Sequence, residues 1–379
     1  MTPPPTLDDE QRHAAALAAL GAAPGVLRRL LDGYGPVEAW QAVARGRHGA
    51  DPGGRYRRRA VPETLERVAA ACERAGVSVA VLGGRGYPPV LASDRQAPAV
   101  LFSIGDVTAH EGKPRVAVVG TRSATPYGVG IAAQLGRDLA RTGVVVVSGL
   151  APGVDAAAHG GALGIDSGAP VVGVLGTSLD ATANRSLTAL RQAASARGAV
   201  LSEIAPGAHS ARWWFSVRNR VMAALAHVVV VVECHHRGGS LDTVSEALAR
   251  GVTVCAVPGS VRSPASAGTN RLLVDGAVPV RDAQDVLTAV ELAIAARPEI
   301  AAPGRLPGAD RPVAPGRGAR PLGPAPSRVR RALDQDPATL EVVVRRSGLS
   351  LGEVSLALEQ LAEAGLAVGE QGWWSRPRG

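Results

Sequence analysis

The sequence is poor in several residue types, and each shortage excludes a class of protein. Of the 41 basic residues only Lys113 is a lysine, and heavy use of arginine with alanine, glycine and proline indicates genome composition rather than function. The three cysteines, Cys72, Cys234 and Cys255, are odd in number and far apart, which argues against a disulfide framework or a zinc site. A reducing, cytoplasmic environment is therefore expected.

Long apolar stretches are also missing. The longest run without Asp, Glu, Lys or Arg is His13–Leu27, and these 15 residues are interrupted by glycine and proline. Such a run is too short and too polar to cross a membrane, so no membrane partner is expected. The first ten residues contain three prolines and three acidic residues in place of a basic and an apolar region, which predicts no signal peptide.

Apolar residues and positive charge, in contrast, are abundant. The chain has 379 residues, 46% of them hydrophobic, which suffices for a sizeable core in two or three domains. The formal net charge is +8, and residues 297–331 concentrate it, with eight basic and two acidic residues and no hydrophobic periodicity. The prolines and glycines of this stretch predict a disordered linker over 297–326. A basic chain attracts polyanions, but a high pI alone proves no nucleic-acid site.

Residues 1–75 are predicted to form a small helical domain. Thr6–Asp9 suits a capping box before a helix that ends near Gly21, and Pro24–Tyr34 suits a second helix. Short helices joined by glycine-containing turns are compatible with a helix-hairpin-helix or SAM-like module, and equally with a small interaction bundle. The segment Arg45–Arg59 carries six arginines against Asp51, and a solvated loop is favoured there over a phosphate contact.

Residues 76–296 are predicted to form a Rossmann-like, doubly wound α/β domain with a mainly parallel sheet. Valine-rich apolar runs alternate with segments of helical spacing, as in sheets that helices cover on both faces. The predicted strands are Arg115–Gly120, Val144–Ser148, Val171–Leu175, Ala199–Ser202, Val228–Glu233 and Thr253–Val257. The predicted helices are Tyr127–Arg141, Val154–Leu163, Ser186–Arg197, Val217–Leu225 and Leu241–Arg250.

Residues 327–379 are predicted to form a winged-helix domain. A capping box at Ser350 precedes the expected recognition helix Leu351–Ala364, and Leu366–Trp374 would form the wing. The recognition helix carries three glutamates and no lysine or arginine, so duplex DNA should repel it. Our hypothesis is that this tail binds protein, or its own Rossmann-like domain, while linker arginines add diffuse electrostatic attraction.

The candidate site lies in the loops that follow the predicted strands, because open parallel sheets bind ligands there. No GxGxxG and no GxxxxGK[ST] is present, so neither a dinucleotide fingerprint nor a P-loop is available and no cofactor is implied. After the first strand, Gly120 permits close backbone approach and Arg122 offers a charged fork ahead of a helix N-terminus. This combination favours phosphate binding over an ordinary loop.

The second strand is followed by another possible anion nest. Ser148 and Gly149 precede a helix start, and Asp155 lies in its first turn, where a carboxylate suits the helix dipole. His159 is one turn further on the same face. No nucleophile or second base accompanies this histidine, which favours a structural role over a catalytic one.

The segment Trp213–Arg220 is the most unusual, because three aromatic residues of a chain with 3% aromatics precede Arg218 and Arg220. Arginines hold phosphates, and aromatic faces stack on unpaired bases. The two arginines do not share one helix face, so a role for both requires the helix start or a loop. Gly238-Gly239-Ser240 adds a further anion cradle before a helix. Several such sites along one sheet edge suit an extended polyphosphate ligand.

Together these motifs resemble the DprA/Smf family, the DNA-processing proteins of natural transformation. The matching segments, in chain order, are Tyr87–Pro88, Val119–Arg122 with Tyr127–Gly128, Ser148–Ala151 with Gly153–Asp155 and Ala158–His159, Ser202–Glu203, Phe215 with Arg218–Arg220, Gly239–Leu241 with Thr243, Val257–Gly259, Gly268–Asn270 and Asp275–Ala277. Their order and spacing are specific, whereas each motif alone is a weak signal.

The resemblance implies a binding protein rather than an enzyme. Members of this family bind single-stranded DNA at the sheet edge, protect incoming DNA, dimerise through the Rossmann-like domain and load the recombinase RecA. On this resemblance the DNA-binding residues are Gly120, Thr121, Arg122, Ser148, Gly149, Arg218, Asn219, Arg220, Gly239, Ser240 and Thr243, with Asp155, His159 and Phe215 as pocket support. No metal is implied.

The chain departs from the family pattern at Pro152, Asp180–Asn184, Gly238, Ala249 and Val252, which suits a divergent member with altered DNA affinity. An alternative function comes from a second resemblance. The spacing of Gly238-Gly239, Thr243 and Glu246 is similar to that of an element in Rossmann-like nucleotide phosphoribohydrolases, where the glutamate assists cleavage of an N-glycosidic bond. A nucleotide-sensing module without chemistry is the third interpretation.

Overall fold

The computed structural model describes residues 6–296, except 209, 210 and 212, and residues 324–333, 338–349, 353–354, 357–358, 360–361, 366–370 and 373–375. The chain divides into two compact units, residues 1–304 and 305–379. Within these described ranges no helix has the length and apolar character that a membrane span requires.

Four helices open the first unit: α1 (Asp9–Ala19), α2 (Pro24–Leu31), α3 (Pro36–Ala44) and α4 (Pro62–Ala75), with the 3-10 turn η1 (Arg57–Arg59) before α4. The predicted capping box at Thr6–Asp9 is wrong by two residues. Asp8 is the cap: its carboxylate accepts from the Gln11 N–H at 2.8 Å, and the Gln11 side chain accepts from the Asp8 N–H at 3.1 Å. Proline in the first turn of α2, α3 and α4 pre-sets the backbone for helix entry.

These helices share a hydrophobic core with the first two strands, β1 (Ser78–Val81) and β2 (Val100–Gly105). Leu17, Leu30 and Trp40 from the helices belong to the same buried cluster as Val79 and Phe102 from the strands. The predicted boundary at residue 75 is therefore a change of secondary structure and not a gap between two cores.

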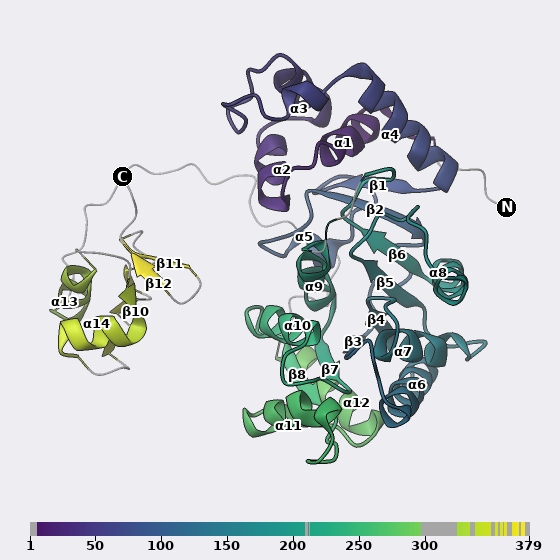
Figure 1. The fold of residues 1–379 in the computed structure, drawn as a ribbon, viewed down its shortest axis with the longest axis vertical. Helices are drawn as coiled ribbons and strands as arrows, with labels where there is room; N and C mark the ends of the chain where they lie inside the picture. The colour runs from purple at the N-terminus through teal and green to yellow at the C-terminus, as the bar shows by residue number, and fades with distance from the viewer. Residues whose placement is uncertain are drawn as a thin grey trace. The chain divides into compact units, whose positions relative to one another are not determined.

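One sheet of nine strands, in the order β1-β2-β6-β5-β4-β3-β7-β8-β9, forms the centre of the first unit (Figure 1). Its other strands are β3 (Arg115–Val119), β4 (Val145–Ser148), β5 (Val171–Leu175), β6 (Ala199–Ser202), β7 (Val228–Val231), β8 (Thr253–Ala256) and β9 (Val278–Pro279). The strands β3 to β9 pair in parallel, and β1 and β2 extend the sheet in antiparallel fashion. The predicted α/β class and mainly parallel sheet are confirmed, whereas β1, β2 and β9 had no counterpart among the predicted strands.

Helices cover both faces of this sheet: α5 (Pro89–Ala92), α6 (Pro126–Arg141), α7 (Val154–Leu163), α8 (Arg185–Arg197), α9 (Trp214–Leu225), α10 (Gly239–Leu248), α11 (Ala267–Val274) and α12 (Ala283–Ala295). Successive residues of β3 point to opposite faces. Val116 and Val118 join a core with α6, α7 and α12, while Ala117 and Val119 join one with α9 and α10. Burial on both sides explains why these strands are continuous apolar runs.

The second unit contains α13 (Pro324–Ala332), β10 (Ala338–Thr339), α14 (Leu340–Ser347), β11 (Val368–Glu370) and β12 (Trp373–Ser375). The strands form an antiparallel sheet in the order β10-β12-β11. Since α13 begins at Pro324, the last residues of the predicted linker are helical, and residues 297–323 lie outside the described part. The proposed capping box at Ser350 also lies outside it. The winged-helix assignment stays a prediction, with which this element order agrees.

Candidate nucleic-acid interface

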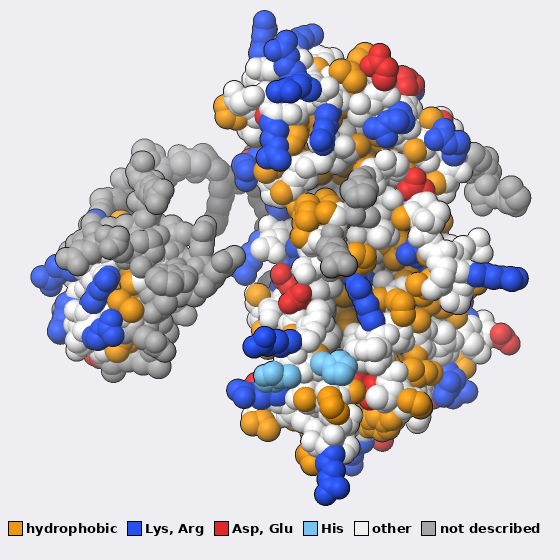
Figure 2. All heavy atoms as spheres, viewed as in Figure 1, with side chains coloured by type: hydrophobic (Ala, Val, Ile, Leu, Met, Phe, Trp, Pro, Cys, Tyr) orange, Lys and Arg blue, Asp and Glu red, His pale blue; other side chains and the backbone are white. Residues whose placement is uncertain are grey.

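The sheet edge contains a cleft at the point where the strand order reverses. The chain runs from β3 outward to β4, β5 and β6, then crosses to the other side of β3 to form β7, which leaves a crevice beyond the carboxyl ends of β3 and β7. The cleft has a volume of about 370 Å³. Its lining residues are Val119, Gly120, Thr121, Arg122, Ala151, Asp155, Phe215, Ser216, Arg218, Asn219, Met222, His235, Arg237, Gly238, Gly239, Ser240, Asp242 and Thr243. Figure 2 shows basic and histidine side chains on this face of the unit, around α10 and the neighbouring sheet edge.

The loop after β3 is held rigidly against the end of β7. The Thr121 N–H donates to the Glu233 carbonyl at 2.8 Å, and the Thr125 N–H and hydroxyl donate to the Glu233 carboxylate at 2.9 and 2.6 Å. Position 120 requires glycine because neighbouring atoms lie too close for a side chain. A Cβ there would lie 2.5 Å from a methyl carbon of Val154 and 2.8 Å from the Glu233 carbonyl oxygen. The cleft floor is therefore set before any ligand binds.

Ser148 and Gly149, both predicted to bind DNA, lie behind the cleft wall and not in it. The Ser148 hydroxyl is fully buried and donates to the Val118 carbonyl at 2.6 Å. The Gly149 N–H donates to the Asp155 carboxylate at 3.1 Å. A Cβ at position 149 would lie 1.8 Å from Nη1 of Arg218, so glycine leaves the space that this guanidinium occupies. In this structure these two residues support the cleft wall, and their predicted contact with DNA stays a prediction.

Two of the predicted arginines reach the cleft in different ways. Arg218 is 7% exposed, and its Nη1 donates to the Val174 carbonyl. Burial lowers the pKa of Arg218, and the negative charge of Asp155 partly offsets that shift. Burial raises the pKa of Asp155, and the positive charge of Arg218 partly offsets that shift. Arg122 is exposed, and its guanidinium carbon lies 4.8 Å from the centre of the Phe215 ring. The rim of the cleft thus carries an exposed cation, Arg122, and the wall carries a buried cation, Arg218.

Arg220 does not reach the cleft. It pairs with Glu203 at 2.6 Å and donates to the Gln96 carbonyl, and neither partner lines the cleft. Both side chains of the Arg220–Glu203 pair are 9% exposed. Positions 218 and 220 differ by about 200° around a helix, and since α9 already begins at Trp214, only one of them can face the cleft. Arg220 therefore lies outside the cleft lining, and its predicted phosphate contact stays a prediction.

The start of α10 forms the wall opposite the β3 loop. The Asn219 amide donates to the Gly239 carbonyl at 3.2 Å, and the Ser240 hydroxyl donates to the Cys234 sulfur at 3.0 Å. Thr243, one turn into α10, lines the same wall and is 1% exposed. The predicted residues Asn219, Gly239, Ser240 and Thr243 therefore come together, beside a helix N-terminus whose first N–H groups suit an anion.

His159 is fully buried and is not part of the cleft lining. Burial lowers its pKa to about 4, so the imidazole is neutral at physiological pH and carries no charge for phosphate. Its predicted structural role agrees with this position. Asp155 and Phe215, the other two residues predicted to support the pocket, do line the cleft.

Two functional candidates in the lining had no place in the sequence prediction, namely His235 and Arg237. Arg237 is exposed, so its charge is available at the mouth of the cleft. The available signal was the run His235-His236-Arg237, which begins four residues after the end of the buried strand β7, at the same strand end as the other loops. Across the described residues, no cluster of histidine, cysteine or acidic side chains is arranged to hold a metal ion.

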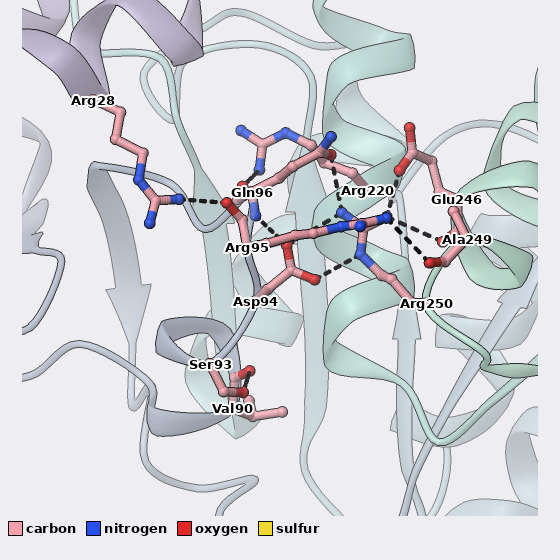
Figure 3. A network of polar contacts seen from close by, with 10 residues as sticks. All are labelled: Arg28, Val90, Ser93, Asp94, Arg95, Gln96, Arg220, Glu246, Ala249 and Arg250. Carbon is pink, nitrogen blue, oxygen red and sulfur yellow. Dashed lines mark hydrogen bonds and ion pairs between the residues drawn. The ribbon is translucent and has the colours of Figure 1, made fainter. Parts of the chain in front are cut away.

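Glu246, the residue on which the hydrolase alternative depends, lies outside the cleft lining. Its carboxylate pairs with Arg250, which also binds Asp94 at 2.7 Å (Figure 3). The same network runs through the loop Asp94–Gln96, which lies between Arg250 and Arg220. A glutamate held there by a structural arginine is not positioned to act on a ligand bound in the cleft.

Comparison with known proteins identifies the relatives of this chain. A sequence model of the family described as DNA recombination-mediator protein A matches residues 78–291. The chain belongs to the DprA family. A protein of Mycobacterium tuberculosis is 40% identical over 280 residues, which cover 73% of this chain and 68% of that protein. The DNA processing protein DprA of Bacillus subtilis is 34% identical over 222 residues, which cover 59% of this chain and 74% of that protein.

Two DprA structures agree with this membership. The structure of DprA from Streptococcus pneumoniae has a TM-score of 0.63 at 29% identity and covers 73% of this chain and 97% of that one. DprA from Helicobacter pylori, described with a single-stranded DNA binding mode, has a TM-score of 0.51 at 27% identity and covers 57% and 96%. The family resemblance expected from the sequence is confirmed.

Proposed function

We propose that this protein binds single-stranded DNA in the cleft between the β3 loop and α10. The observation that carries the proposal is the convergence of Arg122, Arg218 and Arg237, from three separate segments, on one crevice at the sheet edge. Two carboxylates share the lining: Asp155 accepts from the Gly149 N–H, and Asp242 accepts from the Ser216 hydroxyl at 3.0 Å. Their charges remain, so three arginines against two aspartates leave the lining with one net positive charge. The description of the Helicobacter pylori relative supports the same ligand.

Aromatic side chains beside the arginines favour unpaired bases over a duplex. Trp213 is 45% exposed and stacks on Trp214 with ring centres 4.3 Å apart. Phe215 follows at once and is covered by the Arg122 guanidinium. A base that stacks on the outer face of Trp213 leaves its phosphate near these cations, and such stacking tolerates any base. Bases in a duplex already stack on one another, so single strands should bind better.

We propose further that the protein acts in natural transformation and recombination, where it protects incoming single strands and loads RecA recombinase. We also propose that it works in the cytoplasm, as a homodimer formed through the Rossmann-like domain, and without catalysing a reaction. Family membership and the sequence resemblance support these finer assignments. No residue is assigned to the RecA or dimer surface.

The test is fluorescence anisotropy with a labelled single strand and its duplex at several salt concentrations. Wild type is compared with Arg122→Ala and with the matched control Arg137→Ala, which removes an exposed arginine of α6 away from the cleft. We expect preference for the single strand and a salt slope smaller by about 0.7 for Arg122→Ala alone, as for one lost phosphate contact. Equal binding by both variants, or no preference for single strands, would contradict the proposal.

A further inference from the structure

The segment Arg45–Arg59, between α3 and α4, forms a second basic surface that is separate from the cleft lining. Its six arginines are all exposed: Arg45, Arg47, Arg55, Arg57, Arg58 and Arg59. Figure 2 shows basic side chains crowding this end of the first unit, where α2, α3 and α4 meet. We refer to this segment as the arginine loop.

The arginine loop is anchored by buried side chains. His48 is 3% exposed, and its Nε2 lies 2.9 Å from the Leu30 carbonyl oxygen of α2. Asp51 and Tyr56 are 4% and 7% exposed and belong to the part of the loop that packs inward. The alternation of buried anchors with exposed arginines holds the backbone of the loop in place and leaves its arginines in solvent, which agrees with the solvated loop that the sequence favoured.

Within the described part of the chain, no acidic side chain pairs with the arginines of this loop. The Asp51 carboxylate accepts backbone N–H groups, from Arg55 at 2.8 Å and from Tyr56 at 3.1 Å, and so closes the turn instead of pairing with a guanidinium. Among the described residues, none of the six arginines forms an ion pair within 4 Å. Arg59 donates to the Leu20 carbonyl at 3.1 Å, which leaves its net charge in place.

A polyanion is the ligand that such a surface fits. Six like charges on fifteen residues repel one another, and bound phosphates would relieve that repulsion while releasing counterions. An anionic membrane is disfavoured, because amphipathic segments bind membranes by inserting apolar side chains, and the aromatic residue of the loop, Tyr56, is buried. The surface therefore fits the sugar-phosphate backbone of a nucleic acid.

We propose that the arginine loop is a second nucleic-acid site, which contacts phosphates of DNA that extends beyond the cleft and is insensitive to the bases. The inference rests on the proposed function, since it assumes that the cleft binds one part of the same strand. A short oligonucleotide fills the cleft alone. A long strand engages both sites, and its binding depends more steeply on salt.

The test uses the full chain with the triple variant Arg45→Gln, Arg47→Gln, Arg58→Gln. The matched control is Arg137→Gln, Arg185→Gln, Arg262→Gln, which removes three exposed arginines outside the arginine loop and the cleft lining. Anisotropy is measured against salt for oligo(dT) of about 6 and about 60 nucleotides, and thermal unfolding checks that both variants fold. For the long strand we expect the loop variant to lose about 2 units of salt slope, from about 0.7 for each of three contacts, and at least about tenfold in affinity.

The outcomes separate this inference from the proposed function. Unchanged binding of the short strand with weakened binding of the long strand, in the loop variant only, supports the second site. Equal long-strand binding by the loop variant and its control overturns the second site, while a loss in Arg122→Ala still supports the cleft. A loop variant that loses binding to vesicles with anionic lipid but keeps long-strand affinity would also overturn it, in favour of a membrane surface.

Discussion

Replacement of Arg218 by alanine should destabilise the fold, whereas replacement of Arg122 should not. Arg218 is 7% exposed and supplies both a donor to the Val174 carbonyl and the cation that attracts Asp155, which is 6% exposed. Its loss leaves a buried carbonyl without this donor and a buried carboxylate without this cation, for which we expect about 3 kcal/mol of lost stability. Arg122 is exposed, and its replacement should cost less than about 0.5 kcal/mol.

The assay is urea unfolding at pH 7.5 and pH 5 for Arg218→Ala, Arg122→Ala, and Arg218→Ala combined with Asp155→Asn. The double variant should recover about 1 kcal/mol, because the amide keeps the acceptor for the Gly149 N–H but carries no charge. Burial already raises the pKa of Asp155, and loss of Arg218 raises it further. A raised carboxyl pKa lowers folded-state stability as pH rises through it, so the Arg218→Ala penalty should be larger at pH 7.5 than at pH 5. A penalty equal to that of Arg122→Ala, or no recovery in the double variant, would refute the reasoning.

Three further results are expected. Gly149→Ala places a Cβ 1.8 Å from Nη1 of Arg218 and should displace the guanidinium. Anisotropy should then show about tenfold weaker single-strand binding, from the loss of one charged contact. Wild-type affinity in this variant would show that the guanidinium can move without cost. Trp213→Leu should weaken binding of an oligonucleotide by about 1–3 kcal/mol but leave binding of an abasic strand unchanged, and equal losses on both strands would exclude base stacking. Burial lowers the pKa of His110 and His159 to about 4, below the ordinary histidine value of 6.5. The unfolded chain therefore binds more protons in this range, and stability should fall as pH drops from 6.5 to 4. Urea unfolding should show a loss of about 2 kcal/mol for each histidine at pH 5, and His159→Gln should remove about half of the combined loss. An unchanged pH dependence in that variant would contradict the lowered pKa of His159.

The strands that could be predicted from the sequence are those buried on both faces. β7 is a run of valines with no polar interruption, and β3, β4, β5, β6 and β8 follow the same pattern. β9 escaped prediction because its two residues are exposed and one is proline. β1 is a run of four residues whose first residue is exposed, which is too short a pattern to stand out. β2 is buried on both faces, with Val100 and Phe102 in one core and Leu101 in the other, so its burial does not explain why it was missed.

The position of the cleft could be predicted from chain order alone, because parallel strands bring their following loops to one edge. The side-chain directions within it could not. Arg218 and Arg220 belong to the same motif, yet one faces the cleft and the other pairs with Glu203 on a different side of α9. Ser148 ends β4 and Gly149 follows it, as Gly120 follows β3, but both side-chain positions point behind the cleft wall. Leu150, the next residue, adopts a φ of 52°, which few non-glycine residues show. Backbone geometry of this kind leaves no pattern in the sequence.

The N-terminal helices of this chain share a core with the sheet and do not pack as a separate module. They complete the core around Phe102, which is 0% exposed, and a chain that started at residue 76 would present this apolar surface to chaperones and to other copies of itself. Arg28 of α2 donates to the Arg95 carbonyl, and Arg95 reaches the Ala249 carbonyl at the end of α10 (Figure 3). Truncation of this chain at that boundary should therefore lower the stability of what remains, because the helices and the cleft wall belong to one folding unit.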